Sequence, residues 1–170
     1  EMLRSLVGSE MCIRDRYYNQ LLAGQSAGLL INESKKGYPI LIVHEVTVEE
    51  VRAQKLNELR LYDSSEAVNQ FSIDNVSGWW NKATRVGLMN SIAIEKASGR
   101  TETNIWLDNT LFVLPVEKAI DMLQQIELYA LMCYNTTQGH INAINQLETK
   151  EEIEVYNFKT GYPGKLNFIG

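Results

Sequence analysis

A stretch of helical periodicity from Pro115 to Leu147 limits most strongly what this chain can fold into. Its periodic positions recur at intervals of three and four, the spacing that aligns side chains along one face of an α-helix. A proline fits the first turn because its missing N–H would have no partner there. Gly139 leaves two alternatives open. Either one helix of about 32 residues, roughly 48 Å long, bends near this glycine, or two helices follow each other. The periodic positions are Val116, Ala119 or Ile120, Leu123, Ile126, Ala130, Cys133 or Tyr134, Thr137, Ile141, Ile144 and Leu147.

Two shorter helices precede this stretch, and a third follows it. Thr47 can cap a helix that reaches about Tyr62, because Glu50 stands at the reciprocal position of a capping box. A second helix is predicted over Lys82 to Ala97. Its helical face is marked by Val86, Met89, Ile92 or Ala93, and Lys96 or Ala97. Gly99 is placed to end it in a left-handed conformation. Thr149 and Glu152 repeat the capping-box spacing and predict a short helix through Tyr156.

Two Asp-Asn pairs predict hairpin turns between short alternating strands. Asp and Asn tolerate the positive φ angles of tight turns. The pairs are Asp74-Asn75, between Phe71–Ile73 and Val76–Trp80, and Asp108-Asn109, between Thr103–Leu107 and Thr110–Leu114. In the second hairpin we expect Trp106 to lie near Phe112 across the strands. The predicted fold class is α+β, with a small antiparallel sheet of two hairpins packed on three main helices, one of them long.

The first sixteen residues are set apart from the rest. Leu3 to Arg16 closely resembles a translated sequencing-adapter fragment of the kind that contaminates the ends of assembled metagenomic reading frames. It lacks the apolar stretch of roughly 7–15 residues that a secretory signal needs. We therefore predict three parts: residues 1–16, an artefact segment; residues 17–46, a variable N-terminal region; and residues 47–170, the α+β domain.

Within residues 17–46 we expect little regular structure. Gly24, Gly28 and Asn32 punctuate the stretch from Tyr17 to Lys36, a composition that favours a loop with a strand and turn over a helix. Tyr38 to Val43 is an apolar run rich in β-branched residues, which predicts one strand.

Composition excludes several functional classes. With 16 Lys+Arg against 21 Asp+Glu, the net charge of −5 offers no basic excess for nucleic-acid binding. No run approaches the roughly 18 apolar residues of a membrane span. Two cysteines and two histidines cannot by themselves fill a four-ligand zinc site of the usual spacing. We therefore expect no nucleic-acid partner, no membrane partner, no metal and no cofactor.

Catalytic residues are equally sparse, and we predict that the protein is not an enzyme. His44 and His140 are the only side chains that could act as bases near neutral pH. Cys133 lies seven residues before His140, about 10 Å along a helix, which is too far for a hydrogen bond. We interpret Cys133 as a core residue. The alternative left open is a small enzyme that uses His140 with Glu127 or Glu154.

Aromatic residues are the best candidates for an interface. Trp79 and Trp80 are adjacent in a predicted strand, so their side chains should point to opposite faces, leaving one for an interface or for receptor or glycan binding. Where the C-terminal segment folds back, we expect an aromatic seam of Tyr129, Tyr134, Tyr156, Phe158, Tyr162 and Phe168. The candidate interface residues are Trp79, Trp80, Tyr134, His140 and Tyr162.

Several segments, taken in order, resemble a known but uncharacterised family. They are Lys82–Ser91, Ile105–Asp108 with Leu114-Pro115, Glu127–Thr137 with His140, and Thr160–Leu166. This combination resembles a bacteriophage domain found in prophage and gut-phage tail gene cassettes, similar to the C-terminal part of tail-fibre or tail-assembly proteins. The resemblance covers about Leu56 to Phe168. It implies a non-enzymatic tail or tail-fibre-associated protein, partnered by other tail proteins, in the virion or the host bacterial cytoplasm. It assigns no catalytic residues.

Overall fold

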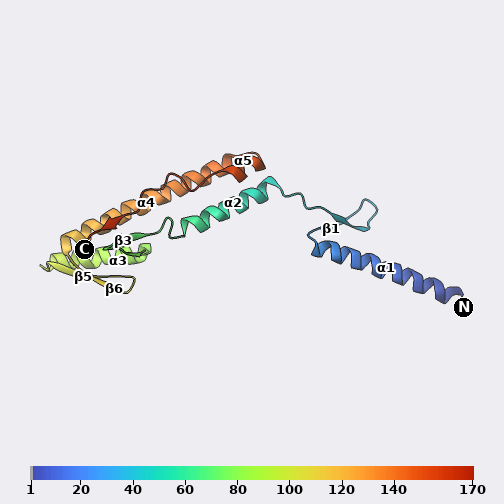
Figure 1. Ribbon diagram of the computed structural model, residues 1–170, viewed down its shortest axis with the longest axis horizontal. Helices are drawn as coiled ribbons and strands as arrows, with labels where there is room; N and C mark the ends of the chain where they lie inside the picture. The colour runs from blue at the N-terminus through green and yellow to red at the C-terminus, as the bar shows by residue number, and fades with distance from the viewer. Residues whose placement is uncertain (1) are drawn as a thin grey trace. The chain divides into compact units, whose positions relative to one another are not determined.

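The chain forms two compact units, Glu1–Thr47 and Val48–Gly170. Figure 1 shows the computed structural model, which describes the backbone from residue 2 and the side chains from residue 14 onward. The predicted artefact segment, residues 1–16, lies largely outside the described side chains. The α+β fold class is confirmed, because five helices and several short strands follow one another within residues 2–170.

The first unit is more regular than predicted. Helix α1 (Met2–Ser26) is followed by strands β1 (Leu30–Glu33) and β2 (Pro39–Ile42), which pair antiparallel. The strand expected over Tyr38 to Val43 is confirmed. The loop expected from Tyr17 onward is wrong as far as Ser26, which is helical.

Gly24 explains why the sequence misled at this point. It lies inside α1, and a Cβ atom there would overlap Cδ1 of Leu41 on β2. The glycine therefore lets the helix approach the strand closely, and Leu21, one turn earlier, is buried. What resembles loop punctuation in the sequence is a packing position in a helix.

The second unit is organised around one long helix, α4 (Val116–Gln146). Helix α2 (Val48–Asp63) lies beside the C-terminal half of α4, and α3 (Lys82–Ala97) lies beside its N-terminal half (Figure 1). Helix α4 continues through Gly139 without a break, so the single-helix alternative is correct. At about 1.5 Å per residue it is roughly 46 Å long. The predicted positions of α2, α3 and the short α5 (Lys150–Val155) are also confirmed.

Both hairpins are present, with the predicted turns. They are β3 (Phe71–Ile73) with β4 (Val76–Gly78) and β5 (Glu102–Leu107) with β6 (Thr110–Pro115). All four residues of the two Asp-Asn turns have positive φ angles between 43° and 69°. This is the backbone that a two-residue type I′ turn requires.

The hairpins do not form one antiparallel sheet, which corrects the expected topology. The second edge of β3 pairs in parallel with β7 (Asn167–Phe168), and β5–β6 forms a separate two-stranded sheet. The expected contact of Trp106 with Phe112 is also wrong. Phe112 stands opposite Ile105 on the buried face, whereas Trp106 stands opposite Leu111 on the outer face and is 60% exposed.

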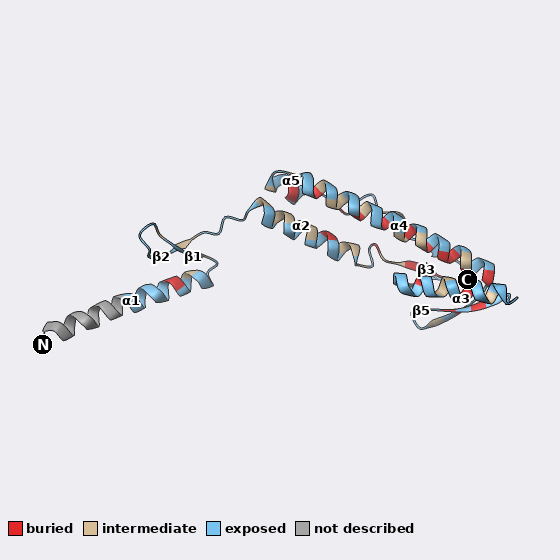
Figure 2. Ribbon diagram, turned by 180° about the vertical axis from the view of Figure 1, so that it is seen from behind, coloured by how far each residue is buried: buried red, intermediate tan, exposed pale blue. Residues whose placement is uncertain are grey.

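The core lies along one face of α4, as Figure 2 shows by the red stripe that follows this helix. The largest cluster joins β3, the inner face of β5–β6 and the N-terminal half of α4, and it includes Phe71, Ile105 and Leu123. A second cluster joins α2, α5 and the C-terminal half of α4 around Leu59 and Ile144. A small third cluster contains Val68, Tyr129 and Cys133, so Cys133 is buried as predicted.

The predicted capping box at the start of α5 gives a first testable prediction. The Glu152 amide donates to Thr149 Oγ1 at 3.3 Å, and the Thr149 amide donates to Glu152 Oε2 at 3.2 Å. These bonds to Thr149 lower the pKa of Glu152 below its usual range. The stabilisation by the ionised carboxylate is therefore present above the unfolded pKa and is lost as pH falls through the folded pKa. We expect Thr149→Ala to raise the pKa of Glu152, measured by NMR titration, whereas Ser98→Ala should leave it unchanged. An unchanged Glu152 titration in Thr149→Ala would contradict the capping box.

Candidate functional site

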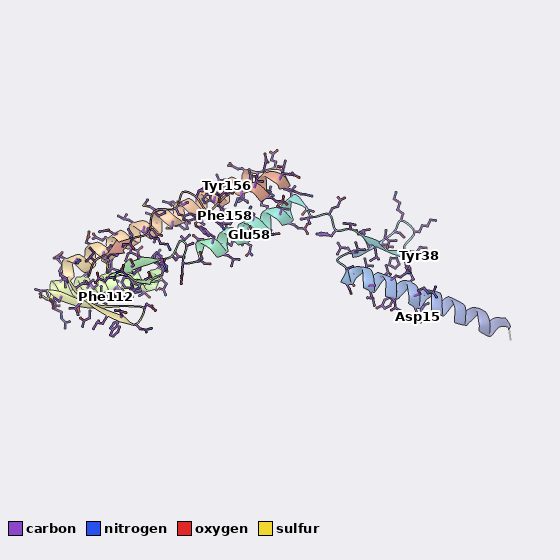
Figure 3. All side chains as sticks on the ribbon, in the orientation of Figure 1. Asp15, Tyr38, Glu58, Phe112, Tyr156 and Phe158 are labelled. Carbon is purple, nitrogen blue, oxygen red and sulfur yellow. The ribbon has the colours of Figure 1, made fainter. Side chains whose placement is uncertain are left out.

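His140 anchors the segment that follows α5 to helix α4. Its Nδ1 lies 2.8 Å from Tyr156 Oη, and its Nε2 lies 2.9 Å from the Thr160 carbonyl oxygen. Its ring packs against Tyr156 and Tyr162. Figure 3 labels Tyr156 where the chain leaves α5 to return along α4. The predicted aromatic seam is therefore present at His140.

The hydrogen bonds of His140 define which tautomer its neutral ring adopts. A carbonyl oxygen can only accept, so Nε2 carries the ring hydrogen and donates a hydrogen bond to the Thr160 carbonyl oxygen. In the neutral ring Nδ1 is then the acceptor for the Tyr156 hydroxyl. Both ring nitrogens therefore hold the returning segment.

Removing this anchor should loosen the returning segment. We expect His140→Ala to lower the free energy of unfolding by about 1–2 kcal/mol, the range for two partly exposed hydrogen bonds. It should also raise amide hydrogen exchange over residues 156–162 more than elsewhere. Gln138→Ala, an exposed substitution on the same helix, is the control. Equal exchange over residues 156–162 in both variants would show that His140 does not hold the segment.

The remaining seam residues are also internal, apart from Tyr134. Tyr162 is half-buried, and its ring packs edge-on against Tyr62. Its hydroxyl oxygen lies 2.9 Å from Thr137 Oγ1. Burial raises the pKa of Tyr162. Tyr134, by contrast, is 59% exposed. Of these residues only Tyr134 could form an interface as predicted.

The two carboxylates named in the enzyme alternative, Glu127 and Glu154, do not pair with His140. Glu127 is thirteen residues from His140 on the same helix, roughly 20 Å away, and it pairs with Arg85. Glu154 contributes its backbone oxygen to Lys55, and neither ring nitrogen of His140 bonds to a carboxylate. Burial raises the pKa of the Cys133 thiol, which keeps it protonated and inert. The part of the chain with described side chains also holds no cluster of three potential metal ligands.

Both adjacent tryptophans pack against Phe71, which corrects the prediction that one of them is left for an interface. Strand β4 ends at Gly78, so Trp79 and Trp80 follow the strand instead of alternating within it. Trp80 is buried, and its indole N–H donates to the Trp106 carbonyl oxygen at 3.1 Å. Trp79 is half-buried and packs against Phe71 and Tyr129. Neither offers the exposed indole that receptor or glycan binding would require.

A surface that the sequence analysis did not identify lies on α4, opposite its core face. Leu128, Leu131 and Met132 are 61%, 54% and 54% exposed. Their i, i+3, i+4 spacing places them on one face of the helix. The core face of the same turns carries Ile126, Tyr129 and Cys133. The sequence does contain a signal for this surface, because residues 128–134 place apolar side chains on every side of the helix. A single core-facing side cannot bury all of them.

Helix α3 adds a second exposed apolar stripe. Val86, Met89 and Ala93 follow Lys82 on one face, and this is part of the face predicted to be buried. The structure buries Ile92, leaves Met89 half-buried, and exposes Val86 and Ala93. The predicted apolar face is therefore wider than the core it packs against.

Between these two stripes runs a groove, which we call the α3–α4 groove. It comprises two adjoining cavities of about 390 and 540 Å³ that share Glu127 and Leu131. One end is charged and polar, and the other is apolar. The lining residues are Lys82, Arg85, Glu127, Ala130, Leu131 and Tyr134 at the first end, and Met89, Gln124, Glu127, Leu128 and Leu131 at the second.

Arg85 fixes the charged end of the groove. Although it is only 6% exposed, its Nε donates to Glu127 Oε1 and its Nη1 donates to the Trp80 carbonyl oxygen, both at 2.6 Å. Its guanidinium also lies 5.0 Å from the centre of the Trp79 ring. A buried arginine held on three sides is a rigid cation, so the electrostatics of this end are set by the fold.

Comparisons of the chain with models of known protein families, with curated proteins and with solved structures find no match. In the part of the chain that the structure describes, no helix is long and apolar enough to span a membrane.

Proposed function

We propose that this chain is a non-enzymatic component of a bacteriophage tail, or a factor in tail-fibre assembly, that acts by binding another polypeptide. The observation that carries protein binding is the α3–α4 groove with its exposed leucines. Contiguous exposed apolar side chains next to a formed groove are typical of a binding surface.

The tail context comes from the resemblance of Leu56 to Phe168 to tail-cassette proteins. Two of the resembling segments, Lys82–Ser91 and Glu127–Thr137, supply groove residues from both helices. The segments that resemble tail-cassette proteins thus include residues of the α3–α4 groove, the surface proposed to bind the partner. This coincidence favours one partner class, the other tail or tail-fibre proteins.

The experiment is co-expression with each tail or tail-fibre polypeptide encoded beside this chain, followed by co-purification. We expect a stable complex with one of them, and detection in purified particles distinguishes a virion component from an assembly factor used only in the host cytoplasm. A chain that remains uncomplexed with every neighbouring tail product, and is missing from particles, would contradict the proposal.

A further inference from the structure

We infer that the α3–α4 groove receives a short amphipathic helix of another polypeptide, which presents two apolar side chains and, about two turns away, a carboxylate. This inference rests on the proposed function and specifies the partner segment for the same surface.

The dimensions of the groove suit a short helix. Its lining covers eight residues along α3, from Lys82 to Met89, and eleven along α4, from Gln124 to Tyr134, which are seven and ten helical steps. At about 1.5 Å per residue these spans are roughly 10 and 15 Å, or two to three helical turns. A helix of this length laid in a groove between two helices is a common mode of peptide recognition, with anchors at i, i+3 and i+4.

The apolar end of the groove provides sites for two anchors. Met89 comes from α3, and Leu128 and Leu131 come from α4. Both leucines are more than half exposed, so a partner side chain between them would remove apolar surface from water. Burial of one aliphatic anchor is worth about 1.5–3 kcal/mol.

The charged end of the groove selects an acidic residue. Lys82 and Arg85 line it at the N-terminus of α3, where the helix dipole adds positive potential. Glu127 is neutralised by Arg85 Nε, and among the described residues Arg85 Nη2 has no hydrogen-bond partner. One guanidinium nitrogen and the Lys82 ammonium are therefore available to a carboxylate. In a chain of net charge −5, this is a local positive site next to an apolar one.

The first test selects partner segments without knowing the partner. A library of helical peptides of about fifteen residues, roughly 22 Å of helix, is selected against the full chain. Binders are then compared on two variants, Leu131→Asp in the groove and Leu61→Asp on α2. Leu61 is 64% exposed and does not line the groove, so it is a matched control for the charge and for the helix propensity.

We expect the selected peptides to lose binding to Leu131→Asp, to keep it with Leu61→Asp, and to share an apolar pair with an acidic residue about two turns away. Replacing that residue with glutamine should weaken binding about five- to tenfold, and Lys82→Gln in the protein should remove most of this difference. Failure to select any Leu131-dependent peptide, or selected peptides without an acidic preference, would overturn the inference. A dimer in sedimentation that Leu131→Asp abolishes would also overturn it, because a second copy would then occupy the groove.

The second test separates this inference from the proposed function. The two variants are co-expressed with the tail polypeptide that co-purifies with the wild-type chain. Loss of the complex in Leu131→Asp alone supports the inference. If both variants keep the complex, the groove inference fails and the proposed function stands. If the wild-type chain binds no tail polypeptide while groove-dependent peptides are selected, the proposed function fails and the groove remains a peptide site.

Discussion

Phe71→Ala is expected to lower the free energy of unfolding by about 4 kcal/mol, because it removes a large buried side chain. Phe71 is 1% exposed, on a strand of only three residues. Its ring centre lies 4.8 Å from that of Trp80, 6.3 Å from that of Trp79 and 6.1 Å from that of Phe168. Its loss would leave a cavity where β3, the segment after β4 and the C-terminal strand β7 meet.

Urea unfolding followed by tryptophan fluorescence measures this effect directly, because two indoles lie against the mutated ring. Phe71→Leu, which keeps most of the volume, should cost about 1 kcal/mol. Trp106→Ala on the exposed face of β5 should cost about 0.5 kcal/mol or less. If Phe71→Ala destabilised no more than Trp106→Ala, the three segments would not meet in one core.

Local signals in the sequence predicted most of the second unit. Asp74-Asn75 and Asp108-Asn109 specify their hairpins because the turn conformation depends only on residues within the turn. Thr149 and Glu152 specify the start of α5 for the same reason, since the capping box is complete within four residues. The core face of α4 followed from its period alone.

Features that depend on distant residues could not be predicted in this way. The parallel pairing of β7 with β3 joins residues almost one hundred positions apart, and nothing in either short segment specifies the other. In the sequence alone Gly24 favours a loop, and only the contact with Leu41 in the structure explains why a glycine stands inside a helix. The face of Trp106 depends on the register of its hairpin, because a shift of one residue exchanges the two faces.

The candidate site was missed for a related reason. The apolar positions of α3 and of residues 128–134 are visible in the sequence, but periodicity alone cannot say which of them a core has room for. Only the packed structure shows Val86, Leu128 and Leu131 left outside. The predicted interface residues Trp79, Trp80, His140 and Tyr162 are aromatic or polar groups that the fold uses internally, where their ring edges and hydrogen bonds have partners.

Arg85→Met is expected to destabilise the protein by about 3 kcal/mol, toward the lower limit for breaking a buried ion pair. The substitution leaves the buried Trp80 carbonyl oxygen without its donor and Glu127 without its counter-ion. Glu127 is 40% exposed, so water compensates in part for the loss of the Arg85 counter-ion. Arg100→Met is the matched control, because the Arg100–Glu95 pair has an arginine that is 67% exposed, and such pairs contribute about 0.2–1 kcal/mol.

A double-mutant cycle with Glu127→Leu tests whether the pair acts as a unit. Removing both charges leaves no unpaired carboxylate at the groove, so the double variant should be less destabilised than the sum of the two single variants, by about 1–2 kcal/mol. Chemical denaturation of all four proteins measures this coupling. Strict additivity would mean that Arg85 stabilises the fold only through Trp79 and the Trp80 carbonyl oxygen. In that case Glu127 would stay available to compete with an incoming carboxylate, and the acidic preference inferred for the α3–α4 groove should be correspondingly weak.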